Sequence, residues 1–329
     1  MGEVKNGLLD IYERRIDYLR ISVTDRCNLR CFYCMPNEGV PFMAYSRILR
    51  YEEILRLTDI FLEMGIKKIR ITGGEPLIRK NILFLVKELG KRKSLRELTL
   101  TTNGIRLSEY AYGLVQAGVE RVNVSLDSLN KKNYKQITGV NLFNNVMQGI
   151  NISQELGLKI KLNIVAMRGR NDGEFLDFLK FGIENDIDIR FIELMPQYYN
   201  DSIAENLFIP EDEVLKIIEK MYTLIPGATG SEKTTAKLYK IKNSRVTVGF
   251  ISAVSHPFCS ECNKIRLMPD GTLRTCLFGD SGVNLKNLLG EKKTKKEIKV
   301  EIVKAVKAKP EKHNLNEEWP KLVMHRVGG

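Results

Sequence analysis

The sequence predicts an α/β fold: an incomplete (β/α)6 barrel of the TIM type, followed by a smaller C-terminal domain. Short β-branched runs alternate with helix-length amphipathic segments from about residue 16 to Met195. Strands joined by helical crossovers form a parallel sheet, and because such crossovers are right-handed, six of them curl into a partial barrel. An open doubly wound sheet is the alternative architecture.

Six segments have the character of strands, and five segments between them have helical periodicity. We expect strands at Tyr18–Thr24, Lys68–Thr72, Glu97–Thr101, Arg121–Ser125, Lys159–Ala166 and Asp188–Leu194. We expect helices at Tyr51–Met64, Asn81–Arg92, Ser108–Ala117, Leu142–Leu156 and Gly173–Asn185. A glycine directly follows three of these helices, at Gly65, Gly118 and Gly157, which is typical of helix C-termini.

The alternation stops after Met195 and Pro196. The following residues are read as a loop with one helix, Glu211–Tyr222, and the remainder of the chain is less regular. We therefore expect a barrel domain at 1–200 and a smaller domain at 201–329, which agrees with the usual domain size of about 150 residues.

Composition and charge narrow the class of protein. The hydrophobic fraction of 43% is that of a globular protein, and no apolar run reaches the length of about 18 residues that a membrane span needs. The N-terminus lacks a signal-type apolar core, so a cytoplasmic location is expected. The net charge of +12 favours an anionic partner. A nucleic-acid-binding protein would interleave aromatic and basic residues, and this pattern is absent from the sequence.

The six cysteines fall into two triplets, which in a cytoplasmic protein are more often metal or cluster ligands than disulfides. The first triplet, Cys27, Cys31 and Cys34, has CxxxCxxC spacing just past the first expected strand. A [4Fe–4S] cluster usually takes four thiolates, so three leave one iron open to a small chelating molecule. The alternatives are an incomplete zinc site or buried structural thiols, but zinc sites usually pair CxxC with histidine.

Other motifs lie at the C-terminal ends of the expected strands, where barrel enzymes place their chemistry. The sequence GGEP at 73–76 follows the second strand; its glycines permit close backbone approach and Glu75 can take an ammonium group. Ser125 ends the fourth strand and Met195 follows the sixth. Together with Tyr33 directly before the last cysteine, these motifs resemble the radical S-adenosylmethionine superfamily.

The second triplet, Cys259, Cys262 and Cys276, again offers only three thiolates. His256 could complete a Cys₃His zinc site, which is the main alternative here. We expect instead a second cluster with an open iron, and hence a C-terminal iron–sulfur domain. The reason is a resemblance that covers nearly the whole chain.

An ordered set of motifs resembles the GTP 3′,8-cyclases, the radical S-adenosylmethionine enzymes that begin molybdenum cofactor biosynthesis. The set is LRISVTDRCNLRCFYCMP at 19–36, IRITGGEPL at 69–77, TTNG at 101–104, the second triplet and a terminal double glycine. Each motif alone indicates the superfamily or less. Their order along about residues 16 to 329 is specific to the family.

This resemblance implies a reaction. A 5′-deoxyadenosyl radical from S-adenosylmethionine would take the 3′ hydrogen of GTP, and the 3′ carbon would then join guanine C8. The product is (8S)-3′,8-cyclo-7,8-dihydroguanosine 5′-triphosphate. Two [4Fe–4S] clusters, a flavodoxin- or ferredoxin-type one-electron reductant and the downstream cyclic pyranopterin monophosphate synthase are implied. We expect a monomer or homodimer that binds neither nucleic acid nor membrane.

The resemblance also assigns residues. It gives Cys27, Cys31 and Cys34 the first cluster, and Cys259, Cys262 and Cys276 the second, whose open iron would bind guanine. Contacts to S-adenosylmethionine are implied for Tyr33, Gly74, Glu75, Ser125 and Met195. Contacts to GTP are implied for Arg20, Arg70, Thr101, Lys161, Arg190, Lys264 and Arg266. Roles in catalysis are implied for Arg20, Lys264, Arg266, Gly328 and Gly329.

The residues themselves support the basic positions. Arg20, Arg70, Lys161 and Arg190 lie inside expected parallel strands, which are normally buried on both faces. A charge there must be paired or functional, and several cations converging on a barrel interior suit a triphosphate. The alternative is one interior ion pair per charge, for which the strands offer Asp188 and Glu193.

One position departs from the family pattern, which typically has an arginine where this chain has Lys264. Lysine keeps the charge but loses the bidentate fork of arginine, so a role that depends on the fork is in doubt. A second hypothesis is a radical S-adenosylmethionine enzyme that modifies a peptide or another cofactor. Such an enzyme would need neither a triphosphate site nor a terminal double glycine.

Overall fold

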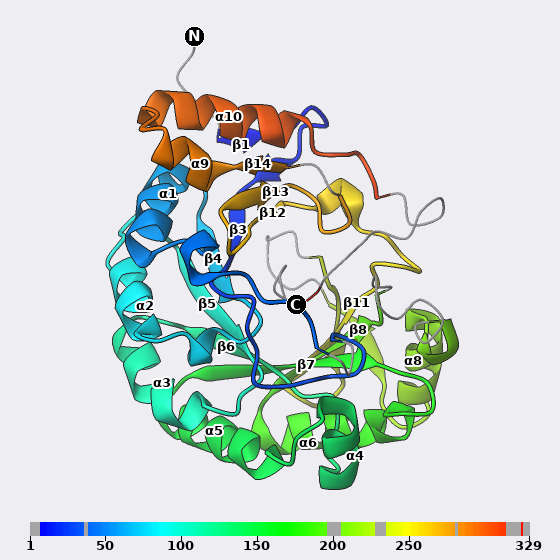
Figure 1. The fold of residues 1–329 in the computed structure, drawn as a ribbon. Helices are drawn as coiled ribbons and strands as arrows, with labels where there is room; N and C mark the ends of the chain where they lie inside the picture. Colours follow the sequence, from blue (N-terminus) through cyan, green and yellow to red (C-terminus); the bar gives the residue numbers. More distant parts are fainter. Residues whose placement is uncertain are drawn as a thin grey trace.

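Six parallel strands form the middle of a twelve-stranded sheet in the computed structural model, which describes residues 7–35, 39–195, 205–227, 235–279, 282–313 and Met324. The strands neighbour one another in chain order: β3 (Tyr18–Ser22), β4 (Lys68–Thr72), β5 (Glu97–Thr102), β6 (Arg121–Ser125), β7 (Lys159–Ala166) and β8 (Asp188–Glu193). Figure 1 shows the sheet curled around a central axis with helices outside it. The predicted α/β barrel fold is confirmed.

The helices cover the outer face of this sheet. They are α1 (Tyr51–Glu63), α2 (Ile82–Gly90), α3 (Leu107–Gln116), α5 (Phe143–Glu155) and α6 (Phe175–Asn185), each within two residues of its predicted ends. Gly65, Gly118 and Gly157 have φ angles of 101°, 76° and 80°, so each follows its helix in the left-handed conformation that glycine adopts without strain.

One helix, α4 (Lys131–Thr138), was not predicted. Its sequence KKNYKQIT is short and mostly polar, and only three of its residues are buried, on one face of the helix. Its ends carry the signals of a helix: the Asn130 side chain accepts hydrogen bonds from the N–H groups of Lys132 and Asn133, and Gly139 ends it with a φ of 78°.

The last third of the chain extends both edges of the same sheet. Strand β11 (Thr247–Ile251) pairs in parallel with β8, and β12 (Lys264–Leu267) pairs in parallel with β3. Antiparallel strands follow outside them: β10 (Lys237–Ile241), β9 (Leu224–Pro226), β13 (Thr272–Arg274) and β14 (Gly282–Asn284). No pairing joins β11 to β12 in the described chain, so the barrel stays incomplete. The domain boundary near residue 201 stays a prediction.

Smaller elements complete the described chain. They are a two-stranded hairpin, β1 (Leu8–Leu9) with β2 (Arg15–Ile16), the helices α8 (Glu211–Ile218), α9 (Leu285–Gly290) and α10 (Lys295–Lys307), and the 3-10 turns η1 (Tyr45–Arg47), η2 (Pro76–Ile78), η3 (Asp172–Glu174) and η4 (Cys259–Glu261). Helix α8 ends before its predicted limit of Tyr222. None of the helices described here has the length and apolar character that a membrane crossing requires.

The strands alternate between an apolar outer face and a polar inner face. In β7 the side chains of Ile160, Leu162 and Ile164 are buried in the main core cluster, whereas Asn163 lines the central cavity. This period-two alternation places the hydrophobic core between sheet and helices. The barrel interior is thereby left to polar and charged groups.

Candidate active site

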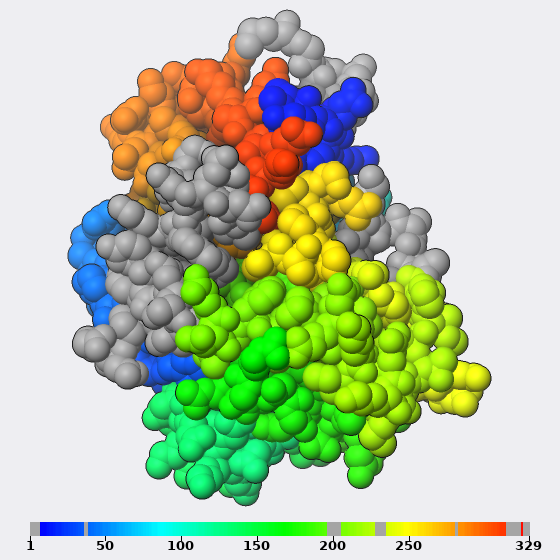
Figure 2. Space-filling view, turned by 90° about the vertical axis from the view of Figure 1, so that its right-hand side faces the viewer, coloured from blue at the N-terminus to red at the C-terminus, as the bar shows by residue number. Residues whose placement is uncertain are grey.

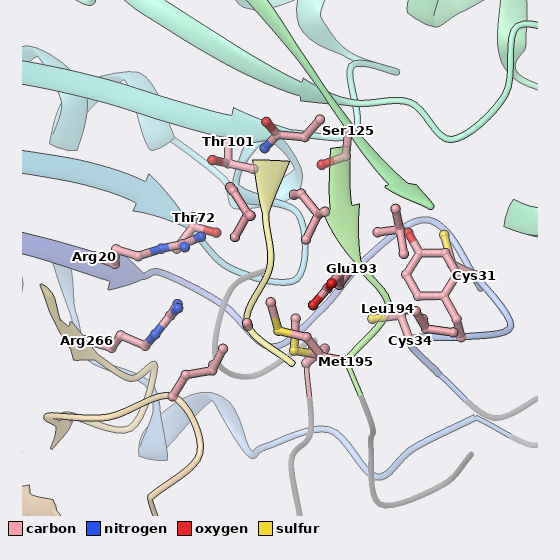
Figure 3. Close-up of a pocket in the computed structure, with 18 of the residues that line it drawn as sticks. Arg20, Cys31, Cys34, Thr72, Thr101, Ser125, Glu193, Leu194, Met195 and Arg266 are labelled. Carbon is pink, nitrogen blue, oxygen red and sulfur yellow. The ribbon is translucent and has the colours of Figure 1, made fainter. Parts of the chain in front are cut away.

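A single cavity at the C-terminal ends of the strands brings the two cysteine triplets into one site. All six cysteines line it, although more than 220 residues separate the triplets along the chain (Cys34 to Cys259). In Figure 3, Arg20 and Arg266 lie on one side of the cavity, and Cys31 and Cys34 lie on the opposite side. The other predicted site residues that line it are Tyr33, Arg70, Gly74, Thr101, Ser125, Met195 and Lys264.

The loop of the first triplet is held by the turn after β4. The Gly74 N–H donates to the Thr24 carbonyl at 2.7 Å, and the Glu75 N–H donates to the Arg26 carbonyl at 2.8 Å. A Cβ atom at position 74 would collide with the Arg26 carbonyl oxygen. Glycine is therefore required there by close approach of two backbones, directly before Cys27.

The thiols of the first triplet lie in a poorly solvated environment. Burial raises the pKa of Cys27 to about 11, with the Glu75 charge adding to the effect. Burial also raises the pKa of Cys31, helped by the neighbouring Cys34, Asp127 and Cys27. Thiolates so placed need positive charge from a bound group, and iron supplies it. The three side chains therefore fit an iron–sulfur cluster.

The described residues do not fit a single metal ion. No three of their histidine, cysteine, aspartate or glutamate side chains converge on one ion position. His256, the fourth ligand in the zinc alternative, lies 3.3 Å from Asp212, has a side chain that is 52% exposed and does not line the cavity. Zinc needs thiolates at about 2.3 Å, whereas a cubane bonds its thiolates to different irons. Among the described residues, His256 is therefore not placed as a fourth ligand of the second triplet.

The connection from β11 to β12 carries Cys259 and Cys262 across the open side of the barrel. Burial raises the pKa of Cys259, although a hydrogen bond from the His313 backbone N–H acts in the opposite direction. Burial acts in the same direction on Cys262, but the Lys309 ammonium, a hydrogen bond from the Lys264 backbone N–H and the Lys264 charge together outweigh it, and the pKa of this thiol lies below its ordinary value. The second triplet thus has one thiolate that is stabilised by a neighbouring cation.

Three arginines lie side by side on adjacent parallel strands. Arg266 of β12 is in register with Arg20 of β3, and Arg20 is in register with Arg70 of β4. Burial lowers the pKa of Arg20, and the charges of Arg266 and Arg70 lower it further. Burial lowers the pKa of Lys264 to about 7. Cys262 acts in the opposite direction, and the charges of the same three arginines lower the pKa further. Such mutually repelling cations are stabilised by a polyanion.

Thr101 adds a polar atom to this region. Its hydroxyl oxygen is buried, lines the cavity and has no hydrogen-bond partner among the described residues. Buried hydroxyl groups without a partner are rare, because they cost free energy. The cavity therefore offers a ligand both cations and an unused hydroxyl.

Lys161 and Arg190 do not line this cavity. The Lys161 ammonium pairs with the Asp188 carboxylate at 3.1 Å, so the interior ion pair considered as an alternative is present for this residue. The Arg190 guanidinium donates to the Ile189 carbonyl at 2.8 Å and to the Thr247 hydroxyl at 3.4 Å. The structure therefore brings Arg20, Arg70 and Arg266 together in the cavity wall, whereas Lys161 and Arg190 do not contribute to that wall.

Comparisons with known proteins agree on one family. The pattern of the Radical SAM superfamily matches residues 21–182, and the pattern named Molybdenum Cofactor Synthesis C matches residues 187–315. A GTP 3′,8-cyclase of Petrotoga mobilis is 44% identical over 98% of this chain and 100% of its own length, and one of Desulforamulus reducens is 45% identical over the same shares. This chain belongs to the GTP 3′,8-cyclase family.

Solved structures share the fold of this GTP 3′,8-cyclase family member. Streptococcus suis SuiB bound to S-adenosylmethionine superposes with a TM-score of 0.59 at 16% identity, over 83% of this chain and 64% of SuiB. SuiB bound to its precursor peptide SuiA gives a TM-score of 0.58 at 15% identity, over 95% of this chain and 71% of SuiB. These likenesses show the fold alone.

Two residues of this GTP 3′,8-cyclase family member that contact the first cysteine loop were assigned no role from the sequence. Asp127 accepts a hydrogen bond from the Tyr33 hydroxyl at 2.6 Å and one from the Val165 N–H at 2.8 Å. Asn103 donates from its side chain to Asn28 at 2.8 Å and approaches the Cys27 sulfur at 3.8 Å. Asn103 directly follows β5 inside the TTNG motif, and Asp127 lies two residues after the end of β6; this position just past a strand end was the available signal.

Glu75 lies behind the cavity wall. Its carboxylate accepts hydrogen bonds from the N–H groups of Leu77 and Asn103 and from the Thr102 hydroxyl, at 2.7–2.9 Å. Burial raises its pKa to about 7, against these hydrogen bonds. In the described structure Glu75 joins the turn after β4 to the turn after β5, and it does not reach the cavity.

The C-terminal end of this GTP 3′,8-cyclase family member is described only at Met324. This residue lines the cavity and packs against the buried Met268, as Leu277 and Phe278 also do. Gly328 and Gly329 lie outside the described residues, so their predicted place at the site stays a prediction.

Proposed function

We propose that this chain catalyses the reaction for which its family is named: conversion of GTP to (8S)-3′,8-cyclo-7,8-dihydroguanosine 5′-triphosphate, the first step of molybdenum cofactor biosynthesis. One observation carries the proposal. A single cavity has a cysteine triplet at each of two sites and three in-register arginines in its wall. Radical chemistry and a triphosphate site are thereby combined in one enclosed space.

Each triplet would hold one [4Fe–4S] cluster, the first on Cys27, Cys31 and Cys34 and the second on Cys259, Cys262 and Cys276. When bound with S-adenosylmethionine, the first cluster would supply the electron that yields methionine and a 5′-deoxyadenosyl radical. That radical would take the 3′ hydrogen of GTP, and after the 3′ carbon joins guanine C8, one further electron and one proton would complete the product. The protein residues bind, orient and exclude water. Three thiolates at each site leave one coordination position for a ligand that is not protein.

Four residues would contact S-adenosylmethionine: Tyr33, Gly74, Ser125 and Met195. All four line the cavity: Tyr33 lies within the loop of the first triplet, Ser125 ends β6, and Gly74 and Met195 lie two residues after the ends of β4 and β8. The Asp127 carboxylate positions the Tyr33 side chain, and the Thr24 carbonyl positions the Gly74 backbone, so both residues are placed by protein contacts before binding. We assign Glu75 a positioning role, because its carboxylate is used by protein donors.

The triphosphate of GTP would lie on Arg20, Arg70, Lys264 and Arg266, with Thr101 beside it. These cations repel one another in the free protein, so phosphate oxygens relieve an unfavourable state as well as form hydrogen bonds. Lys161 and Arg190 lie outside the cavity lining. To contact GTP, the Lys161 ammonium would give up its ion pair with Asp188 and pair with a phosphate oxygen instead. Arg20, Lys264, Arg266 and the terminal glycines Gly328 and Gly329 would also take part in catalysis.

The test is anaerobic turnover with GTP deuterated at the 3′ position, S-adenosylmethionine and dithionite. Mass spectrometry then follows 5′-deoxyadenosine and its deuterium. Deuterium transfer together with the cyclised nucleotide supports the proposal. Unlabelled 5′-deoxyadenosine that forms equally without GTP would reject GTP as the substrate and favour a peptide- or cofactor-modifying enzyme.

The expected setting follows from this reaction. It consumes electrons one at a time, so a flavodoxin- or ferredoxin-type protein would supply them in the cytoplasm. The product would pass to cyclic pyranopterin monophosphate synthase. The enzyme would act as a monomer or homodimer.

A further inference from the structure

A short segment after α10 crosses the second cysteine triplet. This segment, Lys309–His313, is called the strap below. Its last residue, His313, donates from Nε2 to the Ala253 carbonyl at 2.9 Å, and its ring packs on Phe278 at 4.8 Å between centroids. The His313 backbone N–H hydrogen-bonds to Cys259. The strap therefore contacts the chain before Cys259, at Ala253, and after Cys276, at Phe278.

The N-terminal hairpin fastens this strap. The Arg14 guanidinium donates to the Pro310 carbonyl at 2.6 Å, the Glu311 carbonyl at 2.8 Å and the Cys259 carbonyl at 2.7 Å. Asp10 holds Arg14 in place through an ion pair at 2.5 Å in which both side chains are buried. Figure 2 shows the blue N-terminal residues and the red end of α10 side by side. The strap is thus fixed from outside the triplet.

Lys309, the first residue of the strap, points its ammonium at the second triplet. It is only 3% exposed. Nζ donates to the Thr275 carbonyl, to the Lys264 carbonyl at 3.1 Å and to the Cys262 sulfur at 3.5 Å. No carboxylate among the described residues pairs with it. Because a buried ammonium without a counter-charge is costly, the Cys262 thiolate is the anion that justifies its burial.

The surroundings of the thiols in the second triplet differ. Of the two cysteines in the β11–β12 connection, only Cys262 has the ammonium beside it. Lys309 thus distinguishes one ligand of the triplet from the others.

We propose that Lys309 is a positioning residue of the second iron–sulfur cluster, holding the Cys262 thiolate by a charge-assisted hydrogen bond and raising the cluster's reduction potential. The inference rests on the second cluster of the proposed function. Three thiolates give a [4Fe–4S] cluster a net negative charge that grows on reduction, so a buried cation stabilises the reduced form more than the oxidised form. Hydrogen bonds to ligand sulfurs and local charge are known to set such potentials.

The experiment isolates the second cluster in the full-length chain by replacing Cys27, Cys31 and Cys34 with alanine. In this background Lys309→Met removes charge and hydrogen bonds, Lys309→Gln removes the charge but keeps a donor, and Lys309→Arg keeps both. The exposed Lys307→Met, two residues away, is the matched control for loss of one lysine. Iron content, loss of iron to a chelator and the reduction potential from an EPR-monitored titration are measured.

We expect Lys309→Met and Lys309→Gln to lower the reduction potential, whereas Lys309→Arg and Lys307→Met stay near the parent. The iron affinity of Lys309→Met should fall by about 10- to 100-fold, as for other partners of metal ligands. An unchanged potential in a folded, iron-loaded Lys309→Gln would overturn the role of Lys309 and leave the proposed function intact. If the parent binds no iron, both the second cluster and this inference fail.

Discussion

The Tyr33 hydroxyl donates a hydrogen bond of 2.6 Å to Asp127, and this bond joins the first cysteine loop to the end of β6. Asp127 also accepts from the Val165 N–H at 2.8 Å, so the same carboxylate reaches β7. Its burial raises its pKa to about 6, which shows how little solvent reaches it. The loop that would hold the first cluster is therefore anchored to the two strands opposite β3.

We expect Tyr33→Phe to weaken this anchor. The substitution leaves a buried carboxylate oxygen of Asp127 without its donor, which costs about 1–3 kcal/mol. Thermal unfolding of the reconstituted protein measures the loss, and equilibrium binding of S-adenosylmethionine should weaken in parallel. Tyr51→Phe is the control, because it also loses a single hydroxyl hydrogen bond (to the Lys80 carbonyl, at 2.8 Å), but that bond is exposed and Tyr51 itself is only partly buried. Equal losses in the two variants would contradict the special role of Tyr33.

Gly74→Ala should displace the first triplet. The new methyl group meets the Arg26 carbonyl, and overpacking of this kind costs about 1–3 kcal/mol. Because Arg26 precedes Cys27 directly, the expected result is a loss of iron from the first triplet only, measured by iron analysis of a variant that lacks the second triplet. Gly173→Ala, whose Cβ would meet no atom within 4 Å, provides the control. Full iron content in Gly74→Ala would show that the loop adapts.

We expect Arg20→Met to stabilise the nucleotide-free protein and, at the same time, to weaken GTP binding. Removing one of three repelling, buried cations is expected to raise the thermal unfolding temperature of the nucleotide-free protein. The same change should weaken GTP binding by about 10- to 100-fold, since a hydrogen bond to a charged group contributes about 1.5–3 kcal/mol. Isothermal titration with GTP and thermal unfolding measure the two effects. Arg50→Met, at an exposed position, should change neither.

The Lys161–Asp188 pair predicts a pH dependence of stability. Burial, followed by the charge of Arg190, lowers the pKa of Lys161 to about 8, against its ordinary value of 10.5. Because the unfolded chain then holds more protons between these values, the contribution of Lys161 to stability rises as pH increases from about 8 to about 10. The shift corresponds to on the order of 3 kcal/mol.

Comparison of the wild type with Lys161→Met isolates this contribution. The difference in free energy of unfolding between the two proteins should change across pH 7.5–10, as measured by urea titration. Lys180→Met removes an exposed lysine and should give a difference that is constant with pH. A constant difference for Lys161→Met as well would show that this ammonium is not held in a poorly solvated site.

Much of the site could be predicted because its signals are local in the sequence. The six central strands and their helices follow from period-two and helical patterns, and the cysteine triplets follow from spacing alone. Helix α4 was missed because a short polar helix depends on its caps and its packing rather than on an apolar stripe. Lys161 was grouped with the other strand cations because a sequence does not show which of them meets an acid.

The sequence by itself determined the order of the strands, the glycine helix ends at positions 65, 118 and 157, and the ligands available for clusters, since these depend on neighbours in the chain. Only the tertiary structure decided which distant groups meet. It placed β12 beside β3 and β11 beside β8, and so brought Cys262 into the cavity of Cys27. It also placed Lys309 on Cys262. These pairings depend on burial and on the register of strands far apart in the chain, and no local pattern encodes them.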